Sequence, residues 1–154
     1  MSSRNRAPEK LLPVEDRTFI ALLRAADLLE QEAEQLLKTS GLTAAQYNVL
    51  RILRGAEPEG LACSGIGERM ISHDPDMTRL LDRMEKRDLI TRQRQTNDRR
   101  VVRTRITSAG LGLLRRLDMP VRELHKRQFR HLSAGRIKSL VQMLEGIRER
   151  RTGK

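Results

Sequence analysis

Residues 76–106 read DMTRLLDRMEKRDLITRQRQTNDRRVVRTRI, and the spacing of the apolar side chains changes within this stretch. Up to Asp88 the apolar residues lie three or four positions apart, which is typical of a helix with one buried face. Polar residues then alternate with apolar or β-branched ones over residues 89–95 and 101–106, around the turn at residues 96–98. The stretch therefore predicts a helix followed by a β-hairpin with a charged tip.

The two faces of the predicted helix differ in character. The inner face is apolar and carries Met77, Leu80, Leu81 and Met84. The outer face is polar and carries Asp76, Arg79, Arg83 and Lys86. Residues 79–105 contain ten Lys and Arg against four Asp and Glu, whereas residues 56–78 contain one Arg against five acidic residues. Because a solubilising surface usually interleaves the two signs, residues 79–105 are predicted to form an anion-binding face.

Two helices are expected in the first third of the chain. An apolar stripe over residues 19–37 predicts a long helix that ends at Gly41, where a left-handed cap is expected. Thr43 and Gln46 have the spacing of a capping box, which predicts that a second helix covers about residues 44–54.

A short third helix is expected from about Cys63 to Ile71, and a tight break follows it. Asp74 can cap the helix after the break, and Pro75 is tolerated at a first helical position. These residues predict that the basic helix starts immediately after Asp74.

Two more helices are expected after the hairpin. Thr107 and Ser108 cap the first of them, and Pro120 is expected to kink or interrupt it. Ser133 caps a last helix whose apolar edge runs over residues 137–147, and the basic tail at 148–154 is expected to fray. The whole chain is thus predicted to be mainly α, with one small β-hairpin.

Composition narrows the class of protein. The 154 residues carry 31 Lys and Arg against 20 Asp and Glu, a net charge of +11, which favours a polyanionic partner. Only 2% are aromatic, which disfavours a protein that stacks the bases of single strands. A single cysteine suits a reducing compartment, and the sequence shows neither a bilayer-spanning apolar run nor a signal peptide. We therefore expect a soluble cytoplasmic protein that does not bind membranes.

The order helix, helix, helix, charged hairpin is that of a winged helix-turn-helix. A helix with an exposed face of Arg, Lys, Asp and Thr fits the major groove of double-stranded DNA, where base edges can be distinguished. A positive hairpin tip can follow the backbone into the minor groove.

Several segments also resemble the MarR family of transcriptional regulators. They are GLTAAQYNVL at 41–50, IGERM at 66–70, MTRLLDRME at 77–85, DLI at 88–90, and NDRR at 97–100 with Ile106-Thr107 and Gly110 after it. The similarity covers about residues 42–110. The chain departs from the family at Ala62, where the family often has a capping Thr, and at Gly65 and Gly67, which weaken the third helix.

The resemblance implies a homodimer in which the first and last helices of both subunits interleave, and each winged module reads half of a pseudo-palindromic operator. It implies a recognition helix from Asp76 to Arg83 and a wing element Asp98-Arg99-Arg100, in which the aspartate holds an arginine that enters the minor groove. An Asp beside two arginines can fix a guanidinium by a bidentate contact. The expected DNA-binding residues are Asp76, Thr78, Arg79, Arg83, Asp98, Arg99 and Arg100.

The resemblance further implies a pocket for a small aromatic or phenolic effector between the DNA module and the dimerisation helices, lined by residues such as Phe19, Leu23, Tyr47 and Leu114. These four could equally be plain core. The expected layout is a flexible basic arm at 1–14, a dimerisation helix at 15–41, the winged module at 42–106 and dimerisation helices at 107–154. The expected function is that of a sequence-specific DNA-binding transcriptional regulator, a repressor that a small ligand releases from its operator.

Other candidate sites have weaker support. Cys63 lies at a predicted helix start, a position that can favour a reactive thiol, but a lone cysteine beside an apolar helix is more often inert than redox-active. His73, His125 and His131 lack metal-ligand spacing, so no metal is expected. We expect neither a cofactor nor an enzyme, because the sequence has no phosphate-binding loop and no catalytic motif.

Two other functions fit parts of the sequence. Residues 106–154 carry twelve Lys and Arg against four acidic residues, which would suit an architectural protein that coats DNA without operator specificity. A winged module that binds proteins in place of DNA would be expected to have a neutral wing, which this chain lacks. Taken by themselves, Arg79 and Arg83 would be interpreted as part of a solvated helix face that binds nothing. The charged wing that follows them in the sequence favours contact with DNA instead.

Overall fold

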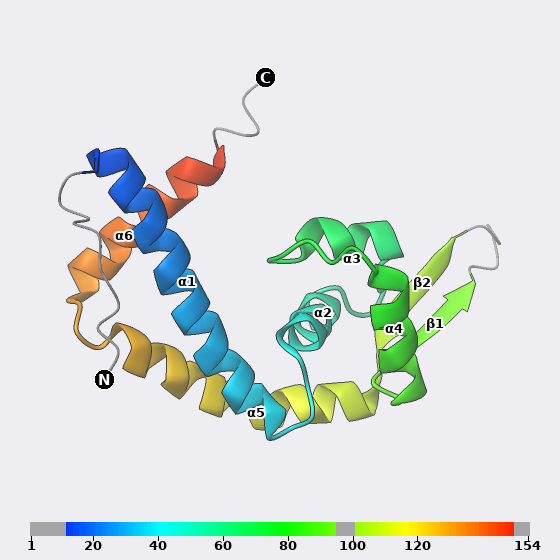
Figure 1. Ribbon diagram of the computed structural model, residues 1–154. Helices are drawn as coiled ribbons and strands as arrows, with labels where there is room; N and C mark the ends of the chain where they lie inside the picture. The colour runs from blue at the N-terminus through cyan, green and yellow to red at the C-terminus, as the bar shows by residue number, and fades with distance from the viewer. Residues whose placement is uncertain (1–11, 95–100, 150–154) are drawn as a thin grey trace, which may run out of the picture.

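The computed structural model describes residues 12–94 and 101–149. The elements are α1 (Val14–Lys38), α2 (Ala44–Arg54), α3 (Cys63–Arg69), α4 (Met77–Lys86), β1 (Ile90–Arg94), β2 (Val102–Ile106), α5 (Ser108–Phe129) and α6 (Ala134–Glu149). Helices α2, α3 and α4 and the hairpin form one arm, α1 and α6 form the other, and α5 runs between them (Figure 1). The mainly α fold with one β-hairpin, predicted from the apolar spacing, is confirmed.

The corner between α1 and α2 has the predicted caps. Gly41 has a φ of 65°, in the left-handed region that favours glycine, and Leu42 N–H returns to the carbonyl of Leu37 at 3.2 Å. Thr43 Oγ1 accepts from Gln46 N–H at 3.2 Å, while Gln46 Oε1 accepts from Thr43 N–H at 3.1 Å. The predicted capping box is therefore present and sets the first residue of α2.

The connection between α3 and α4 differs from the prediction. Helix α3 ends at Arg69 because Met70 is extended, with a ψ of 141°, and packs against the core. Asp76, not Asp74, caps α4, and its side chain accepts from Arg79 N–H at 3.2 Å. Asp74 Oδ1 accepts from Asp76 N–H at 2.8 Å, so Asp74 closes the turn before the cap. The sequence contains two carboxylates that could cap the helix, two residues apart. The first, Asp74, closes the turn, and the second, Asp76, caps α4.

The hairpin is antiparallel, with Ile90 paired to Ile106 at its base and Arg94 paired to Val102 at its far end. Leu61 forms a short antiparallel bridge to β2, on the edge of that strand away from β1. It exchanges two backbone hydrogen bonds with Thr104, at 2.8 and 3.0 Å. A Cβ on the preceding Gly60, whose φ is 68°, would collide with the Thr104 carbonyl. The base of the hairpin is thus fixed to the segment before α3.

Helix α5 is continuous from Ser108 to Phe129, so the expected interruption at Pro120 is wrong. Proline removes only one donor from a helix that core contacts hold on both sides, through Leu117 and Val121. Thr107 caps the helix as predicted, accepting from Gly110 N–H at 3.0 Å.

The last helix, α6, starts after Ser133, whose Oγ accepts from Arg136 N–H at 3.4 Å. It extends to Glu149, so Arg148 and Glu149 are helical, and the rest of the tail expected to fray, residues 150–154, lies outside the described residues. The core lies between α2, α4, α5 and the hairpin base, and α6 contributes no buried residue to it. Within the described residues no helix has both the length and the apolar character needed to cross a membrane.

Candidate nucleic-acid interface

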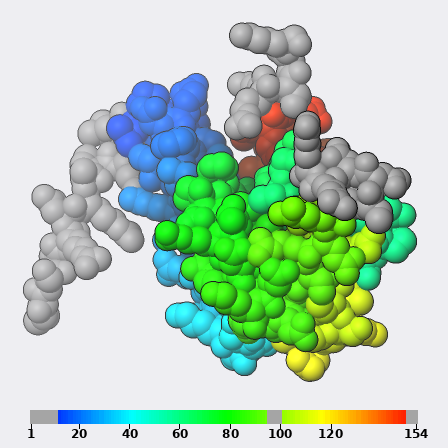
Figure 2. Space-filling view, turned by 90° about the vertical axis from the view of Figure 1, so that its right-hand side faces the viewer, coloured from blue at the N-terminus to red at the C-terminus, as the bar shows by residue number. Residues whose placement is uncertain are grey.

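Helix α4 separates an apolar face from a polar one, as predicted. Leu80, Leu81 and Met84 are buried in the core. Thr78, Arg79 and Arg83 are exposed on the other face. Figure 2 shows α4 and the hairpin strands side by side on the surface turned toward the viewer. This surface presents a helix and a hairpin together, which is the arrangement that a groove and its flanking backbone can accept.

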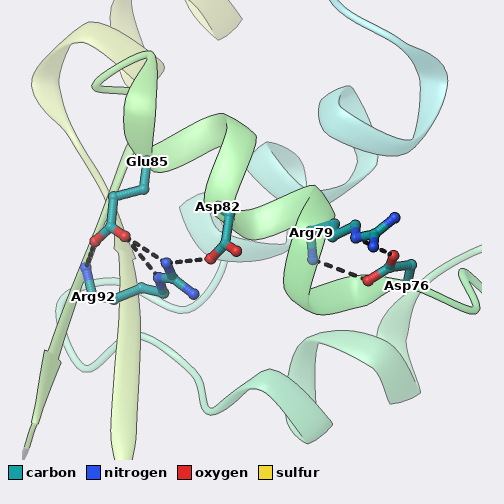
Figure 3. Close-up of polar contacts among 5 residues, drawn as sticks. All are labelled: Asp76, Arg79, Asp82, Glu85 and Arg92. Atoms are coloured by element: carbon teal, nitrogen blue, oxygen red, sulfur yellow. Dashed lines mark hydrogen bonds and ion pairs between the residues drawn. The ribbon is translucent and has the colours of Figure 1, made fainter.

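Asp76 and Arg79 form a pair at the start of α4 (Figure 3). Arg79 Nε lies 3.2 Å from Asp76 Oδ2, while the same carboxylate caps the helix through its other oxygen. The Arg79 side chain is 81% exposed. Because exposed ion pairs contribute little, about 0–1 kcal/mol, the guanidinium can leave Asp76 for a stronger acceptor such as a base edge.

Arg92 joins the wing to α4 and was not singled out from the sequence. Its Nη2 lies 2.5 Å from Asp82 Oδ1 and 2.6 Å from Glu85 Oε2, and its Nε lies 2.9 Å from the same Glu85 oxygen (Figure 3). The hydrogen bond to Glu85 raises the pKa of Arg92 above its usual value. Alternation in β1 places residue 92 on one side of the strand, but nothing in the sequence shows that α4 packs on that side.

Basic side chains also hold the second strand. Arg103 Nη1 donates to the Gly60 carbonyl at 3.1 Å, and Arg105 Nε donates to the Glu59 carbonyl at 3.4 Å. These two arginines therefore fix the hairpin to the segment before α3. The predicted wing residues Asp98, Arg99 and Arg100 lie outside the described residues.

A cavity of about 610 Å³ lies between the two arms. It is bounded by α1, α2, the connection at residues 70–74 and the C-terminal half of α5. Tyr47 lines it, with Arg51 stacked 5.9 Å from the centre of its ring, and burial raises the pKa of the Tyr47 phenol. His73 and His125, from different elements, also line it.

Three of the four residues expected to line an effector pocket do not line this cavity. Leu114 is fully buried in the core, whereas Phe19 and Leu23 are 63% and 56% exposed on the N-terminal half of α1. An apolar stripe shows which face of a helix is turned away from water. It does not show whether a residue on that face packs in the core, lines a cavity or lies in an interface. Side chains that the structure places at the cavity include Leu29, Ala33, Met70, Val121 and Phe129.

Cys63 is exposed at the start of α3. Its exposure alone assigns it no role. Over residues 12–94 and 101–149, no three His, Cys, Asp or Glu side chains lie close enough together to hold a metal ion.

The fold and its exposed basic helix define a winged helix-turn-helix protein of the class that binds duplex DNA. The MarR family model matches residues 42–102. The crystal structure of a MarR transcription factor from Planctomyces limnophilus superimposes with a TM-score of 0.67 at 40% identity, over 84% of this chain and 94% of that one. The chain therefore belongs to the MarR family and is a transcriptional regulator.

Two curated relatives match over most of their length. The HTH-type transcriptional repressor IacR of Pseudomonas putida is 32% identical over 133 residues, which cover 86% of this chain and 78% of that protein. The homoprotocatechuate degradative operon repressor of Escherichia coli is 28% identical, over 84% of this chain and 86% of that protein. Both relatives are named as repressors of transcription.

Proposed function

We propose that this regulator is a repressor that binds a pseudo-palindromic operator as a homodimer and leaves it when a small aromatic or phenolic molecule binds. The observation that carries the proposal is the α4 face on which Arg79 and Arg83 are exposed, opposite the buried side chains of Leu80, Leu81 and Met84. Such a helix is held rigidly by its core side and offers the other side to the major groove.

Each DNA-binding residue has a chemical role in this proposal. Thr78, Arg79 and Arg83 contact base edges and nearby phosphates, and Asp76 caps the helix and orients Arg79 before binding. Arg99 and Arg100 bind the minor groove and its phosphates, with Asp98 fixing one guanidinium. The basic hairpin strands add long-range attraction to the same polyanion.

The exposed apolar side chains support the dimer. Phe19, Leu23 and Leu28 on α1 are more than half exposed, and so are Met143 and Ile147 on α6. Helices of this length with uncovered apolar side chains are stabilised by burial against another surface, at about 25 cal/mol per Å². A second copy supplies that surface with two-fold symmetry, and it places two winged modules to read two half-sites. We therefore assign residues 15–41 and 107–154 to dimerisation and residues 42–106 to DNA binding.

The cavity supports the response to a ligand. Its volume, about 610 Å³, is in the range of small-molecule sites, and it has apolar walls with Tyr47, Arg51 and two histidines available for polar contacts. It lies between the DNA-binding module and the helices assigned to dimerisation, so a ligand there changes the distance between the modules. The name of the E. coli relative refers to an operon that degrades homoprotocatechuate, an aromatic acid, which favours aromatic effectors here too.

The test is an in vitro selection of duplexes from a randomised library, followed by footprinting and light scattering. We expect one enriched inverted repeat, a bounded footprint, and a mass of twice 17.7 kDa for the free protein. Uniform coating of DNA without an enriched sequence would favour the architectural alternative instead. Because operators lie on chromosomal DNA, we also place the protein in the cytoplasm.

A further inference from the structure

We propose that Arg92 is a positioning residue for operator recognition, which locks the wing to α4 at one angle and does not itself bind phosphate. This inference rests on the proposed function, since an angle between two DNA-binding elements matters only when both dock on one duplex. It concerns the Arg92 clamp, defined as Arg92 of β1 with Asp82 and Glu85 of α4.

The hydrogen bonds of the clamp use backbone and side chain together. Arg92 N–H donates to Glu85 Oε1 at 3.1 Å, and the guanidinium donates to Glu85 Oε2 at 2.6 and 2.9 Å. The guanidinium also donates to Asp82 Oδ1 at 2.5 Å. Both oxygens of Glu85 are therefore engaged, one by the strand and one by the side chain. A carboxylate held in this way fixes the strand in distance and in rotation relative to the helix.

The position of Arg92 along the hairpin explains why a clamp is needed there. At the base, Ile90 and Ile106 are buried in the core, but at the far end Arg94 and Val102 are exposed. An isolated two-stranded hairpin is at best marginally stable in water, so its outer half needs a further support. Arg92 lies between the two ends and ties β1 to α4 (Figure 3).

Burial separates Arg92 from the arginines expected to touch DNA. Its side chain is 25% exposed, against 81% for Arg79. To reach a phosphate, Arg92 would have to leave two carboxylates and expose two negative charges beside the same phosphate. The clamp instead offsets one of the two negative charges of Asp82 and Glu85, which reduces the repulsion of DNA from this side of α4.

The test compares variants on two probes, using the full-length protein. The first probe is an operator duplex selected from a randomised library by the unaltered protein, and the second is a duplex of random sequence. The main variant is the charge-balanced Arg92→Gln/Glu85→Gln, which keeps the net charge while removing the clamp's ionic bonds. Arg94→Gln is the matched control, since it removes one exposed charge two residues along the same strand.

For the charge-balanced variant we expect operator affinity to fall by about tenfold or more, because charge-assisted hydrogen bonds are removed. Its affinity for random DNA should change by less than about twofold, with the same dependence on salt. If Arg94 contacts phosphate, Arg94→Gln should weaken both probes alike and reduce the slope of log K against log salt by about 0.9. Arg92→Lys, which keeps the charge but not the fork, should weaken the operator alone.

A DNA-free measurement completes the test. Hydrogen exchange of peptides covering residues 90–106 should be faster in the charge-balanced variant, while a peptide covering 44–54 should exchange as in the unaltered protein. Faster exchange in both peptides would mean that the charge-balanced variant is destabilised as a whole. The test would then rest on Arg92→Lys, which should weaken binding to the operator and not to random DNA.

Three results would overturn the proposal. They are operator binding at unaltered affinity by the charge-balanced variant, equal losses on both probes, or unchanged exchange over residues 90–106. A library that yields no enriched operator would instead refute the proposed function. In that case the exchange measurement still reports separately on the clamp.

Discussion

Arg87 Nη1 donates a hydrogen bond of 2.7 Å to the carbonyl oxygen of Gly41, which bonds the residue that ends α4 to the corner between α1 and α2. The same nitrogen lies 3.4 Å from Gln46 Oε1, the oxygen that accepts the Thr43 N–H in the capping box. Helix α4 is thus tied, through one guanidinium, to the corner that follows α1.

The first prediction concerns Gly41. Gly41→Ala should lower the free energy of unfolding by about 1–2 kcal/mol, because the left-handed φ of 65° is unfavourable for alanine. The new Cβ would also lie 3.3 Å from Arg87 Nη2. Urea denaturation at one fixed chain concentration measures the change. Gly112→Ala is the control: it lies inside α5, where the added carbon would meet nothing within 4 Å apart from its chain neighbours and its own helix backbone, and it should be neutral or stabilising. Equal stability of Gly41→Ala and the unaltered protein would contradict the argument.

The second prediction concerns the dimer. Leu144→Glu should give a monomeric or unfolded chain that does not bind operator, because it places a charge in the proposed interface of α6. Gln142→Glu adds the same charge on the opposite side of the helix and should remain a dimer. Light scattering at micromolar concentration distinguishes one copy of 17.7 kDa from two. A folded Leu144→Glu dimer with full operator affinity would place the interface elsewhere.

The third prediction separates specificity from general affinity. Arg79→Ala should weaken binding to the selected operator by about 1–3 kcal/mol and leave binding to random DNA nearly unchanged, as expected when a base-edge hydrogen bond is removed. Arg122→Ala, which removes an exposed arginine from α5, should not discriminate between the two probes. Competition titrations on both duplexes measure the difference. Equal weakening on both by Arg79→Ala would restrict Arg79 to phosphate contact.

Sequence reasoning succeeded where the determining contacts are local. The caps at Thr43 and Thr107 join residues three positions apart, and their chemistry can be recognised from spacing alone. The α4 core face follows from helical periodicity for the same reason. The order of elements and the class of protein were therefore available without coordinates.

What the sequence could not supply depends on contacts between elements. To predict the Arg92 clamp, one would need to know which side of β1 packs against α4, and the periodicity of the sequence does not show this. Phe19 and Leu114 belong to apolar stripes of similar appearance, yet one is exposed and the other is buried. The choice between Asp74 and Asp76 as the cap depends on a turn whose two carboxylates are chemically equivalent.

The fourth prediction concerns the cavity. Ala33→Trp should fill part of the space between α1 and α2 and prevent stabilisation by aromatic acids. Homoprotocatechuate and salicylate are suitable probes in a thermal-shift assay, where a ligand at 100 times its Kd stabilises by about 2.7 kcal/mol. Ala109→Trp, on the exposed start of α5, should respond to the probes as the unaltered protein does. An undiminished shift in Ala33→Trp would place the effector outside this cavity.

The last prediction concerns Asp98 in the wing. A purely electrostatic role and a positioning role predict opposite changes in DNA affinity when its carboxylate is removed. Removing the carboxylate in Asp98→Ala raises the net charge by one, so a purely electrostatic wing would bind DNA more tightly. If Asp98 holds an arginine in its binding orientation, the operator should be bound more weakly despite the added charge. Glu59→Ala makes the same change in net charge in the segment before α3, and it should not weaken operator binding. Affinities are compared at one ionic strength, and the salt slope of Arg99→Ala/Arg100→Ala should fall by about 0.9 for each phosphate that the wing no longer neutralises. Tighter operator binding by Asp98→Ala would exclude the positioning role and leave the wing as a positive loop.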